Sequence, residues 1–421
     1  MKGPLRDPRF RRLLAGQSLS GFGDTALYLA LGVWAKELTG SNAAAGGVFL
    51  ALGVPTVLSP FAGQLSDRVR RRPLMIVTNA LAAVVVLGLL AVHDRRQLWL
   101  LYAVAFGYGL AASVLSSAGA GLRKSLLGDE QAAAANALLQ SVTQALRVVA
   151  PLVGTGLFVA FGGGAVAVLD AVTFAAAIAA LLSVRVDEQQ PEARPRGSFG
   201  ADLTAGFRHI RSVPLLFQIT VVTACAFGVI GLNETAIFAV VDQGLHRPPS
   251  FFGVLNSVQG VASALGGLAT AALMRRLGPA RVAGFALAAF GAAAAAFTSH
   301  SLSLCLVGAV GDGLGLVWLV VALGTAAQVH TPGRLQGRVN SAWMMLVVTP
   351  QTASIAAGTS LVAVVDYRLM LLAITSVMAA CATLLLLRPA PTPATAPTRV
   401  AAPGTVFEQV PAATATPRDR T

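Results

Sequence analysis

The sequence predicts an all-α membrane protein with twelve transmembrane helices in two pseudo-symmetric six-helix bundles. Three observations support this fold class. First, 55% of the 421 residues are hydrophobic and only 12% are charged, whereas a soluble domain carries about 25% charged residues. Second, apolar stretches of about 20 residues, long enough to cross roughly 30 Å of hydrocarbon, recur along the whole chain. Third, the two halves of the chain share short sequence segments.

The apolar stretches are rich in glycine and alanine. These small residues suit close packing of helices in lipid. A chain with so many spans has no room for a large soluble domain, and a soluble enzyme is excluded by composition. We expect helices at residues 13–36, 43–66, 73–92, 98–122, 137–161, 165–184, 214–241, 251–273, 281–299, 301–329, 339–363 and 367–388.

The formal net charge of +13 is distributed according to topology. If the amino terminus is cytoplasmic, 25 of the 31 lysines and arginines fall on the cytoplasmic side. Arg147 lies inside a span. Such a split follows the positive-inside rule for a chain with both termini in the cytoplasm, and it argues against nucleic acid as a partner. The opposite side holds five basic residues: Lys36, Arg95, Arg96, Arg247 and Arg368.

A polar central segment separates two apolar halves, and a further segment lies at each end of the chain. We expect a cytoplasmic N-terminal segment (1–12), an N-terminal six-helix bundle (13–184), a cytoplasmic linker (185–213), a C-terminal six-helix bundle (214–388) and a disordered cytoplasmic tail (389–421). The tail is rich in Pro, Ala and Thr, a composition that does not build a core. In the linker, Phe199, Leu203, Phe207 and Ile210 repeat at helical spacing and predict an amphipathic helix.

Three segments of the first half recur in the second half, in the same order and at nearly constant offsets. Parallel repeats of this kind are a transporter architecture, with the substrate path at the interface of the repeats. The matches are Asp24-Thr-Ala-Leu-Tyr28 with Glu234-Thr-Ala-Ile-Phe238, Ala105-Phe-Gly-Tyr108-Gly-Leu110 with Ala309-Val-Gly-Asp312-Gly-Leu314, and Asn136 with Asn340.

A charged, glycine-led turn lies between the second and third predicted helices. It reads Gly63-Gln-Leu-Ser-Asp67-Arg68-Val-Arg-Arg71-Arg72. This segment resembles the loop motif Gly-x-x-x-Asp-Arg-x-x-Arg-Arg of the major facilitator superfamily, with Arg70 where that family usually has glycine. The resemblance covers about residues 9–388. It implies that Asp67 latches the cytoplasmic ends of the two halves, whereas the arginines either complete this latch or only set the topology.

Other segments resemble the macrolide-efflux-like branch of drug:proton antiporters in that superfamily. They include Phe10-Arg-Arg-Leu-Leu and Ala135-Asn136-Ala-Leu. In the fifth predicted helix, Pro151 and Gly154 match part of the antiporter motif Gly-Pro-x-x-Gly, with Ala150 in place of its first glycine. The resemblance implies export of hydrophobic compounds by alternating access, driven by protons.

Four carboxyl groups lie inside predicted spans, where an ionised group costs about 2.5–3.5 kcal/mol at the bilayer centre. Asp24 is near the middle of the first helix, so it either takes up and releases a proton or only fixes helix packing. Glu234, its counterpart in the seventh helix, is expected to bind a cationic substrate, share the coupling role or line a solvated mouth. Asp312 lies midway along the tenth helix, which lines the central cavity in the resembled family. For Asp170, near the start of the sixth helix, structural pairing is expected.

Arg147 is the cation expected at mid-membrane depth, one turn before Pro151. Pro151 lacks the N–H that would bond the carbonyl of residue 147, so we expect a bend there. By family analogy Asp24 is the expected partner of Arg147, either in a structural ion pair or in one that opens during transport. Four aromatic residues on predicted cavity helices either stack on flat or cationic substrates or pack between helices: Tyr28, Tyr108, Phe238 and Trp318.

We therefore expect a secondary transporter that exports small amphiphilic molecules against inward proton movement, in a bacterial cell membrane. Acids outnumber the arginine inside the spans, which tilts the expected substrates toward cationic ones. The alternatives are a dedicated exporter of one metabolite, such as a siderophore or self-made antibiotic, and a transport-inactive receptor or scaffold. No phosphate-binding Gly-x-x-x-x-Gly-Lys-Ser/Thr loop is present. No catalytic residues, metal site or cofactor is expected, and we expect a monomer.

Overall fold

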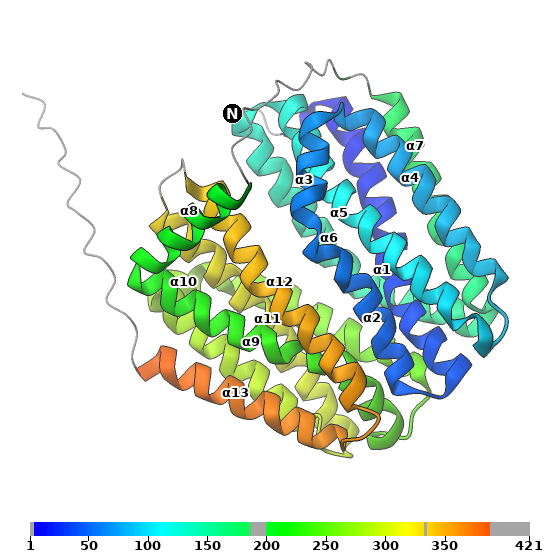
Figure 1. The fold of residues 1–421 in the computed structure, drawn as a ribbon, viewed down its shortest axis with the longest axis vertical. Helices are drawn as coiled ribbons and strands as arrows, with labels where there is room; N and C mark the ends of the chain where they lie inside the picture. The colour runs from blue at the N-terminus through cyan, green and yellow to red at the C-terminus, as the bar shows by residue number, and fades with distance from the viewer. Residues whose placement is uncertain (1–3, 185, 187–198, 332–334, 388–421) are drawn as a thin grey trace, which may run out of the picture. The chain divides into compact units, whose positions relative to one another are not determined.

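The chain was analysed as a computed structural model that describes residues 4–184, 186, 199–331 and 335–387. Throughout this described part it is helical (Figure 1). Short 3-10 helices are η1 (Pro4–Arg6), η2 (Gly88–Ala91), η3 (Arg95–Gln97) and η5 (Pro249–Phe251), and η4 (Val240–Gly244) is a π-helix. The α-helices are α1 (Pro8–Thr39), α2 (Asn42–Val57), α3 (Ser59–Arg68), α4 (Arg71–Leu87), α5 (Leu98–Leu127), α6 (Asp129–Phe161), α7 (Gly163–Ser183), α8 (Phe199–Ser212), α9 (Pro214–Ala239), α10 (Phe252–Ala296), α11 (Leu302–His330), α12 (Gln336–Leu361) and α13 (Tyr367–Leu387).

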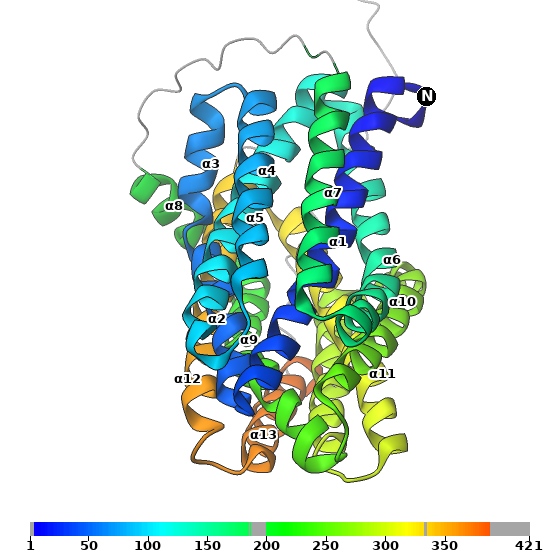
Figure 2. The same cartoon turned by 90° about the vertical axis from the view of Figure 1, so that its right-hand side faces the viewer.

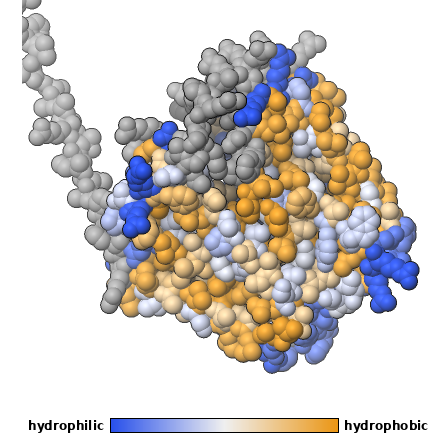
Figure 3. Space-filling view, viewed as in Figure 1, coloured by the Kyte–Doolittle hydropathy of each residue, from blue (hydrophilic) through white to orange (hydrophobic). Residues whose placement is uncertain are grey.

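Eight helical segments of the described part are long and apolar enough to cross a membrane. A multi-pass membrane protein follows from their number. Many large apolar side chains point outward, as lipid contact requires; Leu268 is 81% exposed and Val84 is 69% exposed. On the face in Figure 3, apolar residues predominate and hydrophilic residues gather at its margins. The eight segments are Arg71–Ala91, Arg95–Leu127, Ala134–Phe161, Gly163–Ser183, Pro214–Gly244, Pro249–Ala296, Leu302–Ala327 and Tyr367–Leu387.

Two expected helices differ from the structure at prolines. The stretch expected as one helix over 43–66 is divided at Leu58, which separates α2 from α3. Pro55 and the proline that opens α3 cannot donate backbone hydrogen bonds, so the regular ladder is interrupted between them. The stretches expected as separate helices over 251–273 and 281–299 form α10, in which Gly278 alone leaves the helical conformation. Its φ of 76° suits glycine, and Pro279 follows it.

The first helix has well-defined ends. Asp7 is the N-cap of α1 and accepts a 2.7 Å hydrogen bond from the backbone N–H of Arg9. Capping by an aspartate satisfies an otherwise unpaired N–H of the first turn. At the other end, Gly40 adopts a left-handed φ of 69° and donates to the carbonyl of Lys36 at 2.8 Å. Glycine takes this conformation without steric cost, which is why α1 stops there.

The expected amphipathic linker helix is present as α8. Ile210 is buried with Phe207 against α12, where Val339 and Ala342 belong to the same apolar cluster. The side chains of Phe199 and Leu203 lie outside the described residues, as do most of residues 185–198, residue 388 and the expected tail (389–421).

The two halves of the chain, α1–α7 and α9–α13, share one apolar core. Within the first half, α1 packs along α7 and α6, and α1 and α7 run side by side in Figure 2. Within the second half, α10 packs on α11 and α9 on α12. The halves meet mainly where α2 packs on α12 and α6 packs on α10, and α2 also contacts α9. The polar groups inside this core are therefore candidates for function.

Candidate functional site

A first carboxyl cluster joins three helices of the first half. Asp24 on α1 accepts a 2.5 Å hydrogen bond from the phenol of Tyr108 on α5. Tyr108 is buried and its ring packs against Phe174 on α7, with the ring centroids 6.3 Å apart. Asp24 is half-buried. Its carboxyl group is thus held by a neutral donor, and no ion pair to it occurs among the described residues.

Asp170 on α7 belongs to the same cluster. It is completely buried, and it acts electrostatically on Asp24. Its Oδ1 accepts from the hydroxyl of Thr173 at 3.3 Å, whereas its Oδ2 has no partner. The structural pairing expected for Asp170 is present only in part, since Thr173 on the same helix satisfies one of its two carboxyl oxygens. A buried carboxyl and a half-buried one beside it cannot both be charged at low cost, so this pair is suited to hold a proton.

The close approach of α1 and α7 depends on Gly23. A β-carbon at this position would overlap the carboxyl group of Asp170 and the side chain of Thr173. Glycine next to Asp24 therefore lets the two carboxyl-bearing helices meet. The sequence contains Gly23-Asp24, but nothing in it indicates that α7 lies opposite.

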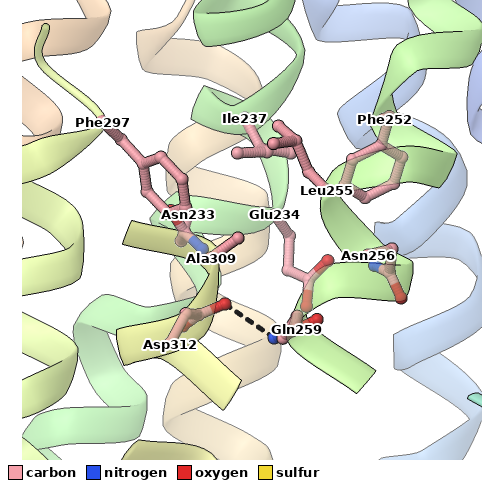
Figure 4. A pocket seen from close by; sticks show the side chains of 10 residues that line it. All are labelled: Asn233, Glu234, Ile237, Phe252, Leu255, Asn256, Gln259, Phe297, Ala309 and Asp312. Carbon is pink, nitrogen blue, oxygen red and sulfur yellow. Dashed lines mark hydrogen bonds between the residues drawn. The ribbon is translucent and has the colours of Figure 1, made fainter. Parts of the chain in front are cut away.

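A second carboxyl cluster surrounds a small cavity in the second half, which we call the Glu234 cavity (Figure 4). Its volume is about 50 Å³, room for a few water molecules. Gln259 on α10 donates to Asp312 Oδ2 on α11 at 2.6 Å, and Glu234 on α9 acts electrostatically on Asp312. The cavity is lined by Asn233, Glu234, Ile237, Phe252, Leu255, Asn256, Gln259, Phe297, Ala309 and Asp312.

Two oxygens at this cavity lack hydrogen-bond partners. Asp312 is 6% exposed, and its Oδ1 is buried without a donor. The side-chain oxygen of Asn233 is also buried and unpaired. Buried polar atoms are nearly always satisfied in folded proteins. The cavity therefore presents acceptors to whatever occupies it.

Arg147 on α6 does not pair with Asp24, so that expected contact is wrong. Its guanidinium instead acts electrostatically on Glu234 and on Tyr28, and its side chain is exposed. The reason is that residue 147 sits where α6 passes Gly260 of α10, so Arg147 acts on Glu234 of the second half as well as on Tyr28 of α1. Arg147 is therefore a cation beside the second carboxyl cluster.

The backbone around Arg147 forms a tight contact between the halves. Pro151 is inside α6 and is buried, and it leaves the carbonyl of residue 147 without its usual donor. Gly260 on α10 lies against that carbonyl, since a β-carbon there would be 2.7 Å from the oxygen. Gly154 meets α1 in the same way, since a β-carbon at this position would be 2.6 Å from the carbonyl oxygen of Ala26. The two motif residues thus place α6 between α1 and α10.

The four aromatic residues occupy different positions. Phe238 is 1% exposed and packs between Phe49 and Phe252, with ring centroids 5.8 and 4.9 Å away. Tyr28 packs on Phe49 at 5.0 Å. We call Tyr28, Phe49, Phe238 and Phe252 the aromatic cluster. It joins α1, α2, α9 and α10. Sequence analysis missed Phe49 and Phe252, because an aromatic residue in an apolar span has no distinguishing signal.

Tyr108 and Trp318 do not belong to this cluster. The phenol of Tyr108 is occupied by Asp24. The indole N–H of Trp318 on α11 donates to the carbonyl of Gly266 on α10 at 3.1 Å, a contact that joins neighbouring helices. Tyr108 is buried, whereas Trp318 is half-buried.

An ion pair links the halves beyond the aromatic cluster. Lys36 of α1 donates to Asp242 of η4 at 2.7 Å and to the carbonyl of Gly40 at 2.9 Å. The Lys36 side chain is 8% exposed and that of Asp242 is 47% exposed. Sequence analysis assigned Lys36 to the side opposite the termini but did not identify this partner, since 206 residues separate the two.

The glycine-led motif lies on α3 and the start of α4. Arg72 donates to the carbonyls of Leu181 and Leu182 at 2.8 and 3.0 Å, at the end of α7, and Arg71 donates to Ser125 at 3.1 Å. Arg68 is exposed, and Gly63 is half-buried beside Ser117. The side chains of Asp67 and Asn340 lie outside the described residues. The latch between the halves stays a prediction.

Sequence analysis also missed Arg123 on α5. It is 7% exposed and donates to Asn136 on α6 at 2.6 Å and to Gln17 on α1 at 2.9 Å. The signal that could have identified it is a basic residue directly after an apolar span, followed by a polar partner on the next helix. Within the described residues, no group of three or more His, Cys, Asp or Glu side chains could hold a metal ion.

Comparisons with known proteins agree with this architecture. The model of the Major Facilitator Superfamily matches residues 13–243 and 223–415. An uncharacterized MFS-type transporter of Bacillus subtilis (strain 168), YfiS, is 24% identical over 269 residues, which are 63% of this chain and 63% of that protein. The match thus spans less than two thirds of that relative.

Solved structures share the fold at low sequence identity. A bacterial homologue of the iron transporter ferroportin, in an inward-facing state, has a TM-score of 0.68 at 18% identity and covers 92% of this chain and 98% of its own. The nucleoside transporter NupG gives 0.72 at 12% identity, over 90% and 99%. The POT family transporter PepTSo gives 0.74 at 12% identity, over 92% and 98%. The chain belongs to the Major Facilitator Superfamily and is a multi-pass membrane protein.

Proposed function

We propose that this chain exports small amphiphilic molecules by alternating access coupled to proton influx, as a member of the macrolide-efflux-like drug:proton antiporter branch. The observation that carries the proposal is the Asp24 cluster. A half-buried carboxyl in a membrane-spanning helix, held by a phenol and facing a second carboxyl, can gain and lose a proton as its surroundings change from dry to wet.

The proposed topology has twelve crossings in two six-helix bundles. The first bundle comprises α1, α2 with α3, α4, α5, α6 and α7. The second comprises α9, the two parts of α10 on either side of Gly278, α11, α12 and α13. At 1.5 Å per residue the 45 residues of α10 are roughly twice as long as a single crossing needs. The positive-inside rule then supports cytoplasmic termini in a bacterial cell membrane.

The positions of the charged groups support a division of roles. The Asp24 cluster lies within the first half, and the Glu234 cavity lies within the second. Arg147 on α6 reaches electrostatically across the interface to Glu234. We assign the proton to the first cluster and the substrate to the second, with Arg147 coupling the two halves.

Contacts between the halves support an inward-open conformation. The Lys36–Asp242 ion pair and the aromatic cluster both join the halves toward the side opposite the termini. Transport by alternating access requires these contacts to break when the outer side opens, because the same residues cannot seal and admit substrate at once. The small Glu234 cavity also keeps open the alternative of a dedicated exporter of one metabolite.

An accumulation assay tests this function. Cells that lack their own pumps and express the chain are expected to accumulate less ethidium and erythromycin than cells without it. A protonophore should remove this difference, and Asp24→Asn should also remove it. Asp366→Asn, which changes an acid near the start of α13 rather than in either cluster, is the matched control. Unchanged protonophore-sensitive export in Asp24→Asn would show that the proton assignment is wrong, and no difference for the unmodified chain would refute drug export.

A further inference from the structure

We infer that the Glu234 cavity is a binding site for a protonated amine, and that a primary ammonium group is the part of the substrate that it holds. This inference deepens the proposed function, since it names a chemical group within the expected substrates. It depends on the geometry of α9, α10 and α11 and not on the proton site.

The acceptors in the cavity define the occupant. Asp312 Oδ1 and the side-chain oxygen of Asn233 are buried and unpaired, and both residues line the cavity with Glu234 (Figure 4). An ammonium group has three N–H donors and no acceptor. Its three donors can therefore satisfy these two oxygens and the Glu234 carboxylate together. A neutral hydroxyl has one donor and would leave buried oxygens unpaired, which costs about 1–3 kcal/mol for each.

The charges lead to the same occupant. Two carboxyl groups, Glu234 and Asp312, interact in this cavity, and one cation, Arg147, acts on Glu234 from outside it. When both carboxyls are ionised, one negative charge remains uncompensated. Buried charges are stable only when they are paired. A single monovalent cation in the cavity would balance the remaining negative charge.

The remaining walls favour an organic cation over an inorganic one. Phe252, Ile237 and Leu255 line the cavity beside the polar groups. Apolar side chains next to an ammonium-sized polar site suit the carbon atoms that carry an amine. Because the cavity holds about 50 Å³, only the ammonium group and its first carbon atoms fit. The rest of the molecule must extend beyond the cavity.

Binding to the purified full-length chain in detergent tests the inference without any transport step. Isothermal titration with benzylamine, benzyl alcohol and benzyltrimethylammonium compares three ligands that share one ring. We expect benzylamine to bind about tenfold or more tightly than each of the others. Equal binding of the alcohol would refute a cation site. Equal binding of the quaternary ammonium would refute the role of the N–H donors.

Variants locate the site. Asp312→Asn and Glu234→Gln are expected to weaken benzylamine binding by about tenfold or more, whereas Glu37→Gln, which removes an exposed acid of α1, should leave it unchanged. Benzylamine binding that is unaltered in both cavity variants would overturn the assignment. If a cavity variant does not fold, the comparison of the three ligands on the unmodified chain still tests whether a primary ammonium group is bound.

The two proposals fail in different ways. If Asp312→Asn stops protonophore-sensitive export but binds benzylamine normally, Asp312 carries a proton and the amine site is refuted, while the transport proposal stands. If benzylamine binding follows the expectation but no export is detected, the amine site stands and the export proposal fails.

Discussion

The phenol of Tyr108 donates a 2.5 Å hydrogen bond to the carboxyl group of Asp24, and so joins α5 to α1 within the first half of the chain. The repeat relates Asp24 to Glu234 and Tyr108 to Asp312. The second pair also meets, since Glu234 acts electrostatically on Asp312. The two halves therefore build polar pairs at equivalent positions, with a neutral donor in the first half and a second acid in the other.

Tyr108→Phe removes the donor to Asp24 and keeps the ring. A hydrogen bond to a charged group contributes about 1.5–3 kcal/mol, so we expect a lower thermal unfolding midpoint and slower protonophore-sensitive export. Tyr102→Phe is the matched control on the same helix, since its hydroxyl donates to the carbonyl of Ala44 at 3.2 Å and touches no carboxyl. Equal export rates in the two variants would contradict a coupling role for the Tyr108 hydroxyl.

Gly154→Ala tests the contact of α6 with α1. The added β-carbon would lie 2.6 Å from the carbonyl oxygen and 2.8 Å from the α-carbon of Ala26, and backbone atoms cannot move away easily. We expect a loss of about 1–3 kcal/mol in the free energy of unfolding. Gly156→Ala lies two residues further along α6, and its added β-carbon would have no atom within 4 Å. It should be neutral or stabilising, since alanine favours helix over glycine by about 1 kcal/mol. Similar unfolding midpoints would mean that this contact is not tight in the protein.

The Lys36–Asp242 ion pair is expected to hold the outer ends of the halves together. Lys36→Met leaves Asp242 without its partner. Because Asp242 is about half exposed, the change should favour the outward-open state by only about 1 kcal/mol, a factor of roughly five in population. The exchanged pair Lys36→Asp with Asp242→Lys should restore the closed state.

Thiol labelling from outside measures this opening. The reporter is Ile237→Cys, at a position that is 4% exposed and lies in the wall of the Glu234 cavity. The background variant has serine at Cys225, Cys305 and Cys381. A membrane-impermeant maleimide is expected to label the reporter about five times faster with Lys36→Met. An unchanged labelling rate would exclude the ion pair as an outer closure.

Arg72→Lys separates a structural role from a topological one. Lysine keeps the positive charge that orients the loop, but it cannot reproduce the fork that contacts the carbonyls of Leu181 and Leu182. We expect the end of α7 to loosen, with a loss of about 1 kcal/mol in stability because the contact is partly exposed. Arg68→Lys, at an exposed position, should change nothing. If neither Arg72→Lys nor Arg68→Lys changes stability, the contact of Arg72 with the end of α7 is not stabilising, and the positive charge alone accounts for these two arginines.

Much of the site could be read from the chain. Asp24, Glu234 and Asp312 were predicted as candidates because a carboxyl in an apolar span is costly wherever it points, so its presence makes a functional role a reasonable hypothesis. The repeat paired Tyr108 with Asp312 and Asp24 with Glu234, because similar segments occupy similar places in the two halves. Pro151 and Gly154 were expected from the resemblance to the antiporter motif, and the structure places both on α6.

Sequence by itself determined the class of protein, since hydropathy and charge are properties that add up along the chain and need no knowledge of contacts. The tertiary structure decided which charged groups interact: Asp24 acts electrostatically on Asp170, Arg147 acts electrostatically on Glu234, and Lys36 forms an ion pair with Asp242. The reason is geometric. One residue along a helix turns a side chain by about 100°, because there are 3.6 residues per turn. Where each helix is rotated and how closely it crosses its neighbours depends on packing between segments far apart in the chain.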